Sequence, residues 1–250
     1  AIITAADLQQ FGNPPADAKI QYGDELLQFG ELRLPKNTGP HSVAIVIHGG
    51  CWRAKYGLSY MRELAAALAD SGLATWSIEY RRIGNKGGGW PGTFTDVGKA
   101  ADFLRSIAGE YRLDLNRVIV VGHSAGGHLG LWLASRPQIP PGTPLSSPAP
   151  LSVKGVLALA PAPDVSILHD KKVCGHIIDK LMGGSPEQYP QRYQLGDPML
   201  LAPSGVPQSL VIGKYDDAWA PSGLRYFDAA LARGEKACEK LTHNIPAIST

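Results

Sequence analysis

A serine between two glycines lies where an apolar run changes into a helical pattern. The stretch "NRVIVVGHS" (116–124) predicts a buried strand, and "AGGHLGLWLAS" (125–135) predicts a helix directly after it. Ser124 stands between Gly122 and Gly126, which matches the pattern G-x-S-x-G. Such a turn lifts a serine hydroxyl out of the sheet on a strained backbone, and the helix start directs free N–H groups at a reacting carbonyl. We therefore expect Ser124 to be a nucleophile.

A serine hydroxyl needs a general base and a carboxylate that orients the base. The segment "GKYDDAWAP" (213–221), at the end of the last clear strand pattern, supplies two acids. We favour Asp216 as the orienting carboxylate because it lies nearer the strand end, and we interpret Asp217 as a solvated loop acid. Of the seven histidines only His243 follows these acids, as the order Ser…Asp…His requires. The predicted triad is Ser124, Asp216 and His243.

Donors for the oxyanion are expected after another buried strand, "HSVAIVIHGG" (41–50), which runs into the motif "HGGCW". Glycines there allow backbone N–H groups to turn inward. The predicted donors are the amides of Gly50 and Cys51, together with the amide of Ala125 after the nucleophile. Trp52 ends the motif and is expected to line the acyl or alcohol pocket, with a buried packing role as the alternative.

Several other histidines lie close to these motifs and need a separate interpretation. His48 begins the HGG turn and is expected to organise that loop through hydrogen bonds. His123 and His128 lie beside the nucleophile, where we expect structural roles with satisfied ring nitrogens. We therefore assign the base to none of these three.

Strand and helix patterns alternate along most of the chain. Strands are predicted over 28–35 (at a sheet edge), 41–50, 73–80, 116–124, 153–163 and 208–217, and helices over 58–72, 93–111, 125–135 and 222–234. This alternation predicts an α/β fold, with a mostly parallel central sheet, helices on both faces and a ligand site at the carboxyl ends of the strands. We expect one domain over 1–250, with a surface arm over 1–25 and a cap-like excursion of short helices over 165–200.

Composition excludes several function classes. The chain has 250 residues, and its 44% hydrophobic content allows a sizeable core. The net charge is +2 without a long run of one sign, so a nucleic acid partner is not expected. No apolar stretch reaches about 18 residues, so no transmembrane helix is predicted. The sequence lacks zinc-type Cys/His spacing and phosphate-binding glycine motifs, so neither a metal nor an organic cofactor is expected.

The three cysteines allow two interpretations. Cys51, Cys174 and Cys238 form no CxxC pair, and we favour buried thiols because free cysteine is often buried. The alternative is a Cys51–Cys174 disulfide in an oxidising compartment, with Cys238 left single. The first residue is Ala1 rather than Met, which fits removal of a signal peptide and export to the periplasm or medium; otherwise a cytoplasmic location is expected.

These motifs resemble those of the α/β-hydrolase superfamily, and most closely its small esterases in the carboxylesterase and kynurenine-formamidase-like branch. "HGGCW" is similar to the HGGxW motif and "GHSAGGH" to the nucleophile elbow, and "EYRRIG…WPGTFTDVGKAADFLR" and "LMGGSPEQYPQRY" resemble further family segments. The resemblance covers roughly residues 25–232. It ends before His243: the family pattern places a strand and a small loop before the catalytic histidine, whereas only "EKACEKLT" separates Gly234 from His243.

The resemblance implies a serine hydrolase that cleaves carboxylic esters through an acyl-enzyme intermediate. The excursion over 165–200 is too small for a lipase lid, so we expect small or short-chain esters. Two alternatives stay open at this point. One is an amidase or formamidase that uses the same triad, and the other is a non-catalytic protein of the same fold that binds a ligand. A small molecule is the expected partner, and the sequence does not indicate an oligomeric state.

Overall fold

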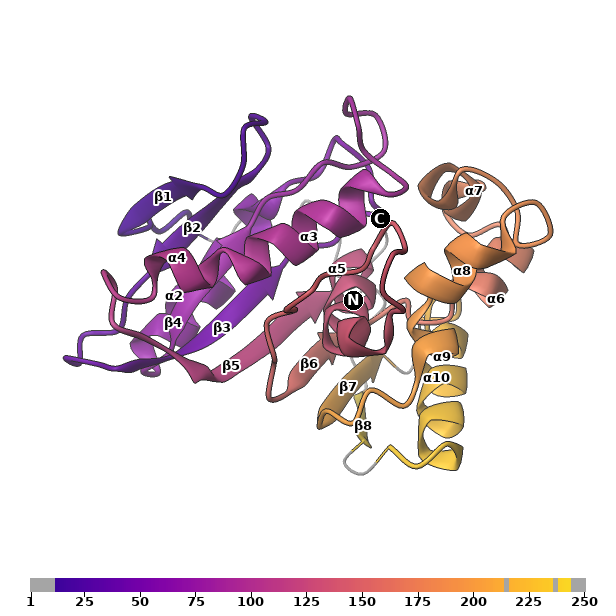
Figure 1. Cartoon of the computed structure of the whole chain (residues 1–250). Coiled ribbons are helices and arrows are strands. Elements are labelled where there is room, and N and C mark those ends of the chain that lie inside the picture. The colour runs from indigo at the N-terminus through magenta and orange to yellow at the C-terminus, as the bar shows by residue number, and fades with distance from the viewer. Residues whose placement is uncertain (1–11, 214–215, 236–237, 244–250) are drawn as a thin grey trace.

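The computed structural model describes residues 12–213, 216–235 and 238–243, and for 238–243 it describes the backbone alone. Within these residues one eight-stranded sheet has the order β1-β2-β4-β3-β5-β6-β7-β8 (Figure 1). The strands are β1 (Ala18–Gln21), β2 (Phe29–Arg33), β3 (His41–Ile47), β4 (Ala74–Ile78), β5 (Leu113–His123), β6 (Val156–Leu159), β7 (Gln208–Gly213) and β8 (Cys238–His243).

Helices connect most of these strands. They are η1 (Leu58–Met61), α2 (Arg62–Asp70), α3 (Gly92–Asp102), α4 (Leu104–Ile107), α5 (Ala125–Ser135), η2 (Arg136–Gln138), α6 (Val165–Asp170), α7 (Ile177–Met182), α8 (Pro190–Gly196), α9 (Pro198–Leu201) and α10 (Ala220–Ala232). None of the helices in the described part of the chain is long and apolar enough to cross a bilayer. The short helices α6 to α9 all lie between β6 and β7, in the segment predicted to form the excursion.

The sheet is parallel from β4 through β8, and only β1 and β2 run antiparallel to their neighbours. The predicted α/β fold with a mostly parallel sheet is therefore confirmed. Its consequence is that β3, β5, β6, β7 and β8 all end at one edge of the sheet, so the loops after them meet there. This carboxyl edge carries every residue predicted to take part in chemistry.

The two faces of the sheet bury separate apolar clusters, because successive side chains of a strand point to opposite faces. Val46 packs with Met61 and Ala65 of η1 and α2 on one face. Its neighbours Ile45 and Ile47 belong to the larger core on the other face, which includes residues of α3 and α5. In Figure 1, α3 and α5 lie together in front of the sheet and α2 lies behind it.

The sequence analysis was wrong about both edges of the sheet. It placed β2 at an edge, but β1, which lies within the predicted surface arm over 1–25, pairs antiparallel with β2 and forms the edge. Ala18 and Ile20 explain this position because they pack, partly buried, against the main core. At the other edge no strand was predicted, yet "CEKLTH" forms β8 beside β7. Edge strands commonly carry charged residues, so their apolar pattern is weak.

Candidate active site

Ser124 stands alone between the end of β5 and the start of α5. Its φ of 54° and ψ of −118° are unfavourable for a residue with a side chain, and its N–H donates to the carbonyl of Leu159 at 2.8 Å. The residue is 7% exposed, so its hydroxyl belongs to a nearly closed site rather than to the open surface. This is the strained strand-to-helix turn that G-x-S-x-G predicts.

The two flanking glycines are required by close backbone packing. A Cβ added to Gly122 would overlap the carbonyl oxygen of Gly126 in the first turn of α5. A Cβ added to Gly126 would overlap the carbonyl oxygens of Ile47 and His48, at the end of β3. The turn around Ser124 is therefore pressed directly against the start of the HGG segment, which brings the two predicted motifs together.

The HGG segment turns beside the serine in a left-handed backbone conformation. Gly50, Cys51 and Trp52 have φ values of 106°, 49° and 52°, and the N–H of Arg53 closes the turn on the Gly50 carbonyl at 2.9 Å. A Cβ at Gly49 would lie 2.9 Å from the Cβ of Ser124. Among the described residues, the amides of Gly50, Cys51 and Ala125 donate to no acceptor. They are thus unused donors close to Ser124.

Tyr60 of η1 contacts both motifs, and the sequence analysis missed it. Its Oη accepts the N–H of Gly49 at 2.5 Å and lies 2.9 Å from Nδ1 of His123. The residue sits in a segment that the apolar spacing assigned to a helix, and a tyrosine in such a pattern gives no signal of a polar contact. Only the three-dimensional approach of η1 to the two turns reveals it.

His48 organises the HGG turn, as expected. Its Nδ1 donates to the Gly49 carbonyl at 2.8 Å, and its Nε2 lies 2.9 Å from both Glu79 Oε1 and Arg82 Nη1. Burial, with the Arg82 charge as a second cause, lowers the pKa of His48 to about 3, so the ring is neutral. Since Nδ1 carries the proton, Nε2 accepts from Arg82, which also pairs with Glu79. The hydroxyl of Tyr80 donates to the His48 carbonyl at 2.7 Å.

His123 and His128 are structural histidines that stay uncharged. Burial lowers the pKa of each to about 4, and the nearby His48 contributes to the shift of His123. His128 donates from Nε2 to the Gly196 carbonyl at 2.9 Å and meets Trp52 edge to face. Trp52 has no exposed surface, which agrees with the packing role that was the alternative to pocket lining.

Asp216 begins the turn that leads from β7 into α10. Its N–H donates to the Gly213 carbonyl at 3.2 Å, and its Oδ1 accepts the N–H of Trp219 at 3.3 Å. Burial raises the pKa of Asp216 above its usual value, and the Trp219 bond opposes that rise. Asp216 and Trp219 both border a shallow hollow. Asp217 is exposed, so the structure gives the two acids different surroundings.

His243 is the last residue of β8, and its backbone lies opposite Gly213 of β7. Its side chain lies outside the described residues, so the predicted base has a place on the sheet but no described contact. Ser124, Asp216 and His243 thus follow or end β5, β7 and β8 at the same carboxyl edge. Within the described part of the chain, no group of three His, Cys, Asp or Glu side chains could hold a metal.

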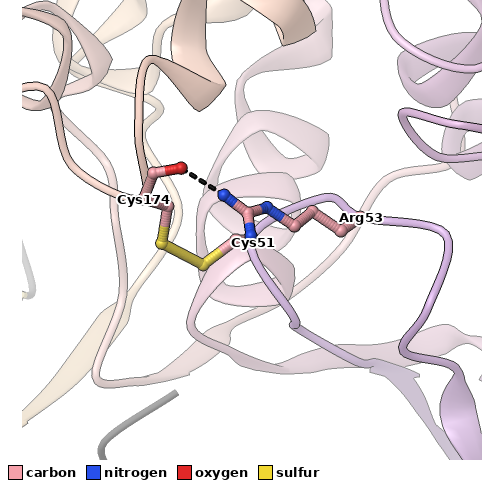
Figure 2. The surroundings of a disulfide bond; sticks show 3 residues. All are labelled: Cys51, Arg53 and Cys174. Atoms are coloured by element: carbon pink, nitrogen blue, oxygen red, sulfur yellow. Dashed lines mark hydrogen bonds between the residues drawn. A yellow bond between two sulfur atoms is a disulfide. The ribbon is translucent and has the colours of Figure 1, made fainter.

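A disulfide joins Cys51 in the HGG segment to Cys174 between α6 and α7 (Figure 2). The favoured prediction of free buried thiols is therefore wrong for these two cysteines, and the alternative pairing is present. The Arg53 guanidinium adds a second link by donating to the Cys174 carbonyl. Together they tie the candidate oxyanion turn to the short helices between β6 and β7.

With this geometry in place, the comparisons with known proteins identify the family. The model of the BD-FAE family matches residues 31–222 of this chain, from β2 into α10. The chain belongs to the BD-FAE family. The match includes both glycine motifs and Asp216, and it ends before β8.

Several curated relatives of this BD-FAE family member have names of esterases. It is 31% identical over 150 residues to "Esterase LipC" of Mycobacterium tuberculosis, covering 55% of this chain and 36% of that protein. It is 30% identical over 120 residues to a probable isoprenylcysteine alpha-carbonyl methylesterase of Arabidopsis thaliana, covering 48% of this chain and 25% of that protein. The chain thus spans about a quarter to a third of the length of these relatives.

Solved structures extend the likeness over nearly the whole BD-FAE chain. Esterase B of Lactobacillus rhamnosis, in a tributyrin phosphonate complex, is 22% identical with a TM-score of 0.76, over 95% of this chain and 78% of that one. A truncated carbohydrate esterase from gut microbiota is 19% identical with a TM-score of 0.76, over 91% and 89% of the two chains. These neighbours confirm the α/β-hydrolase fold.

The packing at the elbow yields a stability prediction. We expect Gly122→Ala to lower the free energy of unfolding by about 1–3 kcal/mol or more, because the new methyl group has to displace backbone rather than a flexible side chain. Gly109→Ala is the matched control, since a Cβ there would meet no atom within 4 Å. Urea unfolding of both variants measures the difference. Equal stability of the two variants would contradict the described packing.

The disulfide yields a second stability prediction. Residues 51 and 174 are 123 positions apart, so the bond restricts a long loop in the unfolded chain and should stabilise the fold by about 2–5 kcal/mol. We expect Cys51→Ala, Cys174→Ala and the double variant to lose similar amounts, because each removes the same bond. Denaturant unfolding without reductant measures this. If the two single losses in unfolding free energy add up in the double variant, the disulfide is not the main stabilising interaction of these cysteines.

Proposed function

We propose that this protein is a serine hydrolase that cleaves small or short-chain carboxylic esters through an acyl-enzyme intermediate. The observation that carries the proposal is Ser124 on a strained, glycine-flanked turn whose neighbouring turn holds unused backbone donors. BD-FAE membership and the esterase names of the relatives support the same reaction class. The short helices α6 to α9 support a preference for small substrates, since none of them exceeds seven residues.

In the proposed first step, Ser124 Oγ attacks the acyl carbon while His243 accepts the hydroxyl proton. The carbonyl oxygen becomes an oxyanion that the amides of Gly50, Cys51 and Ala125 stabilise, each contributing about 3 kcal/mol. The tetrahedral intermediate collapses, His243 returns the proton to the leaving alcohol, and the acyl group stays on Ser124. Water, deprotonated by His243, then attacks the acyl-enzyme and releases the carboxylic acid.

Asp216 is proposed to orient the base and stabilise its charged form. Its position after β7, one strand from β8, supports this role, and its half-buried setting makes its interaction with an imidazolium stronger than that of an exposed acid. His48, His123 and His128 are poor alternatives to His243 as the base. Burial lowers their pKa values to about 3 to 4, and each ring bonds within the fold through at least one nitrogen, although Nδ1 of His128 is buried without a partner, contrary to the expectation.

The central test is the turnover of p-nitrophenyl acetate and butyrate by wild type and Ser124→Ala. We expect Ser124→Ala to lose at least about 10³-fold in kcat, because the nucleophile is removed while the oxyanion donors remain. Ser71→Ala, which alters an exposed hydroxyl at the end of α2, should keep wild-type turnover. Turnover in Ser124→Ala equal to wild type would contradict a serine mechanism, and faster cleavage of an aryl amide than of the matched ester would favour an amidase.

The two neighbouring acids provide a matched pair for the orienting role. We expect Asp216→Asn to lower kcat by about 10²- to 10⁴-fold, because an amide cannot stabilise the charged base, and Asp217→Asn to stay within about twofold of wild type. The kcat of His243→Ala should fall as far as that of Ser124→Ala. Combining Ser124→Ala with His243→Ala should lower kcat little further. Steady-state kinetics with p-nitrophenyl butyrate measure all four variants. A large loss in Asp217→Asn with little in Asp216→Asn would reverse the assignment.

A further inference from the structure

A single phenol hydroxyl connects the two turns on which the proposed reaction depends. Tyr60 Oη lies 2.5 Å from the backbone N of Gly49 and 2.9 Å from Nδ1 of His123. Gly49 directly precedes the proposed oxyanion donors, and His123 directly precedes Ser124. The hydroxyl therefore bridges two segments that are 74 positions apart in sequence and end different strands, β3 and β5.

The direction of the two hydrogen bonds follows from the groups involved. A backbone N–H can only donate, so Tyr60 Oη accepts from Gly49 and has its own hydrogen free for His123. Nδ1 of His123 accepts that hydrogen only when the ring is neutral, and burial lowers the pKa of this ring to about 4. The rings of Tyr60 and His123 meet edge to face with centroids 5.7 Å apart, which restricts both side chains.

The bridge also lies close to the nucleophile itself. The place that a Cβ at Gly49 would occupy is 2.9 Å from the Ser124 Cβ and 3.1 Å from Tyr60 Oη. Gly49 has no side chain that could anchor the turn, so its orientation depends on what holds its backbone. Its N–H bond to Tyr60 fixes the His48–Gly49 peptide, and the His48 ring holds the Gly49 carbonyl in the peptide that leads to the Gly50 amide.

We propose that Tyr60 is a positioning residue of the ester-hydrolysis site, whose hydroxyl fixes the HGG turn relative to Ser124 by bridging the Gly49 amide and His123. This inference rests on the proposed function. Oxyanion donors act only when they lie about 3 Å from the developing charge, so a small displacement of the turn weakens the transition state more than the bound substrate. The hydroxyl of Tyr60 should therefore affect kcat rather than KM.

The test compares two tyrosines near the same turn. Tyr60→Phe removes one oxygen atom and should lower kcat for p-nitrophenyl butyrate about tenfold, with KM within about twofold of wild type. Tyr56→Phe is the control, because the Tyr56 ring lies beside Gly50 but its hydroxyl makes no hydrogen bond within the described residues. The rate constant for phosphonate inactivation should fall with kcat in Tyr60→Phe and stay unchanged in Tyr56→Phe.

A second set of variants tests the bridge independently of any general loss of packing. His123→Leu removes the acceptor for the Tyr60 hydroxyl, whereas His123→Asn keeps an acceptor near the position of Nδ1. We expect His123→Asn to retain more activity than His123→Leu, and the effect of Tyr60→Phe to shrink to less than about threefold in the His123→Leu background. Independent, multiplicative losses in the double variant would overturn the bridge.

Failure of this inference is distinguishable from failure of the proposed function. If wild type shows turnover that Ser124→Ala lacks, and Tyr60→Phe matches wild type in kcat and inactivation rate, the role of Tyr60 is overturned and the serine mechanism stands. If wild type shows no turnover that depends on Ser124, the proposed function and this role are both overturned. A tenfold fall in kcat that appears equally in Tyr56→Phe would also overturn the specific role of the bridge.

Discussion

The site depends on the lack of space for a Cβ where β5, α5 and β3 converge. Gly122 faces the carbonyl of Gly126, and Gly126 faces the carbonyls of Ile47 and His48. Because backbone meets backbone here, α5 can start immediately after β5, and the one residue between them adopts a left-handed conformation. The cost of that conformation is of order 1–3 kcal/mol, and the packing of two strands and a helix around it offsets the cost.

The same convergence explains why the buried histidine of the HGG turn is neutral and hydrogen-bonded. His48 lies in the carbonyl-rich turn after β3, and its ring bonds to the Gly49 carbonyl and approaches Glu79 and Arg82 after β4. Burial removes the water that would solvate a charged imidazole, and this loss of solvation keeps the His48 ring neutral. In the proposed mechanism, backbone dipoles in this buried setting act more strongly on a developing oxyanion than they would in water.

Sequence reasoning succeeded where one local pattern determined the structure. The apolar runs of β3, β4 and β5 predicted buried parallel strands, and Gly122, Ser124 and Gly126 predicted the turn. It failed where a contact between distant segments decides the outcome. In the sequence, Tyr60 is one residue of an apolar helical pattern, and no local feature distinguishes its hydroxyl from that of Tyr56. Its role follows only from the packing of η1 against the two turns.

The predictions for the cysteines and for the sheet edges were wrong for related reasons. The pairing of Cys51 with Cys174 depends on α6 and α7 folding back over the HGG segment, which spacing alone does not encode. The edge strands β1 and β8 have one neighbour each, so few of their positions need to be apolar. A strand at the edge is specified mainly by the strand that it pairs with, and that information is remote in the sequence.

The order of the strands constrains how a triad can assemble at this edge. Two strands, β6 and β7, lie between β5 and β8, and neighbouring strands are about 4.8 Å apart, so about 14 Å separates the ends of β5 and β8 across the sheet. Asp216 follows β7 and lies within that span. A base that bonds to both Ser124 and Asp216 therefore has to occupy the space over the ends of β6 and β7.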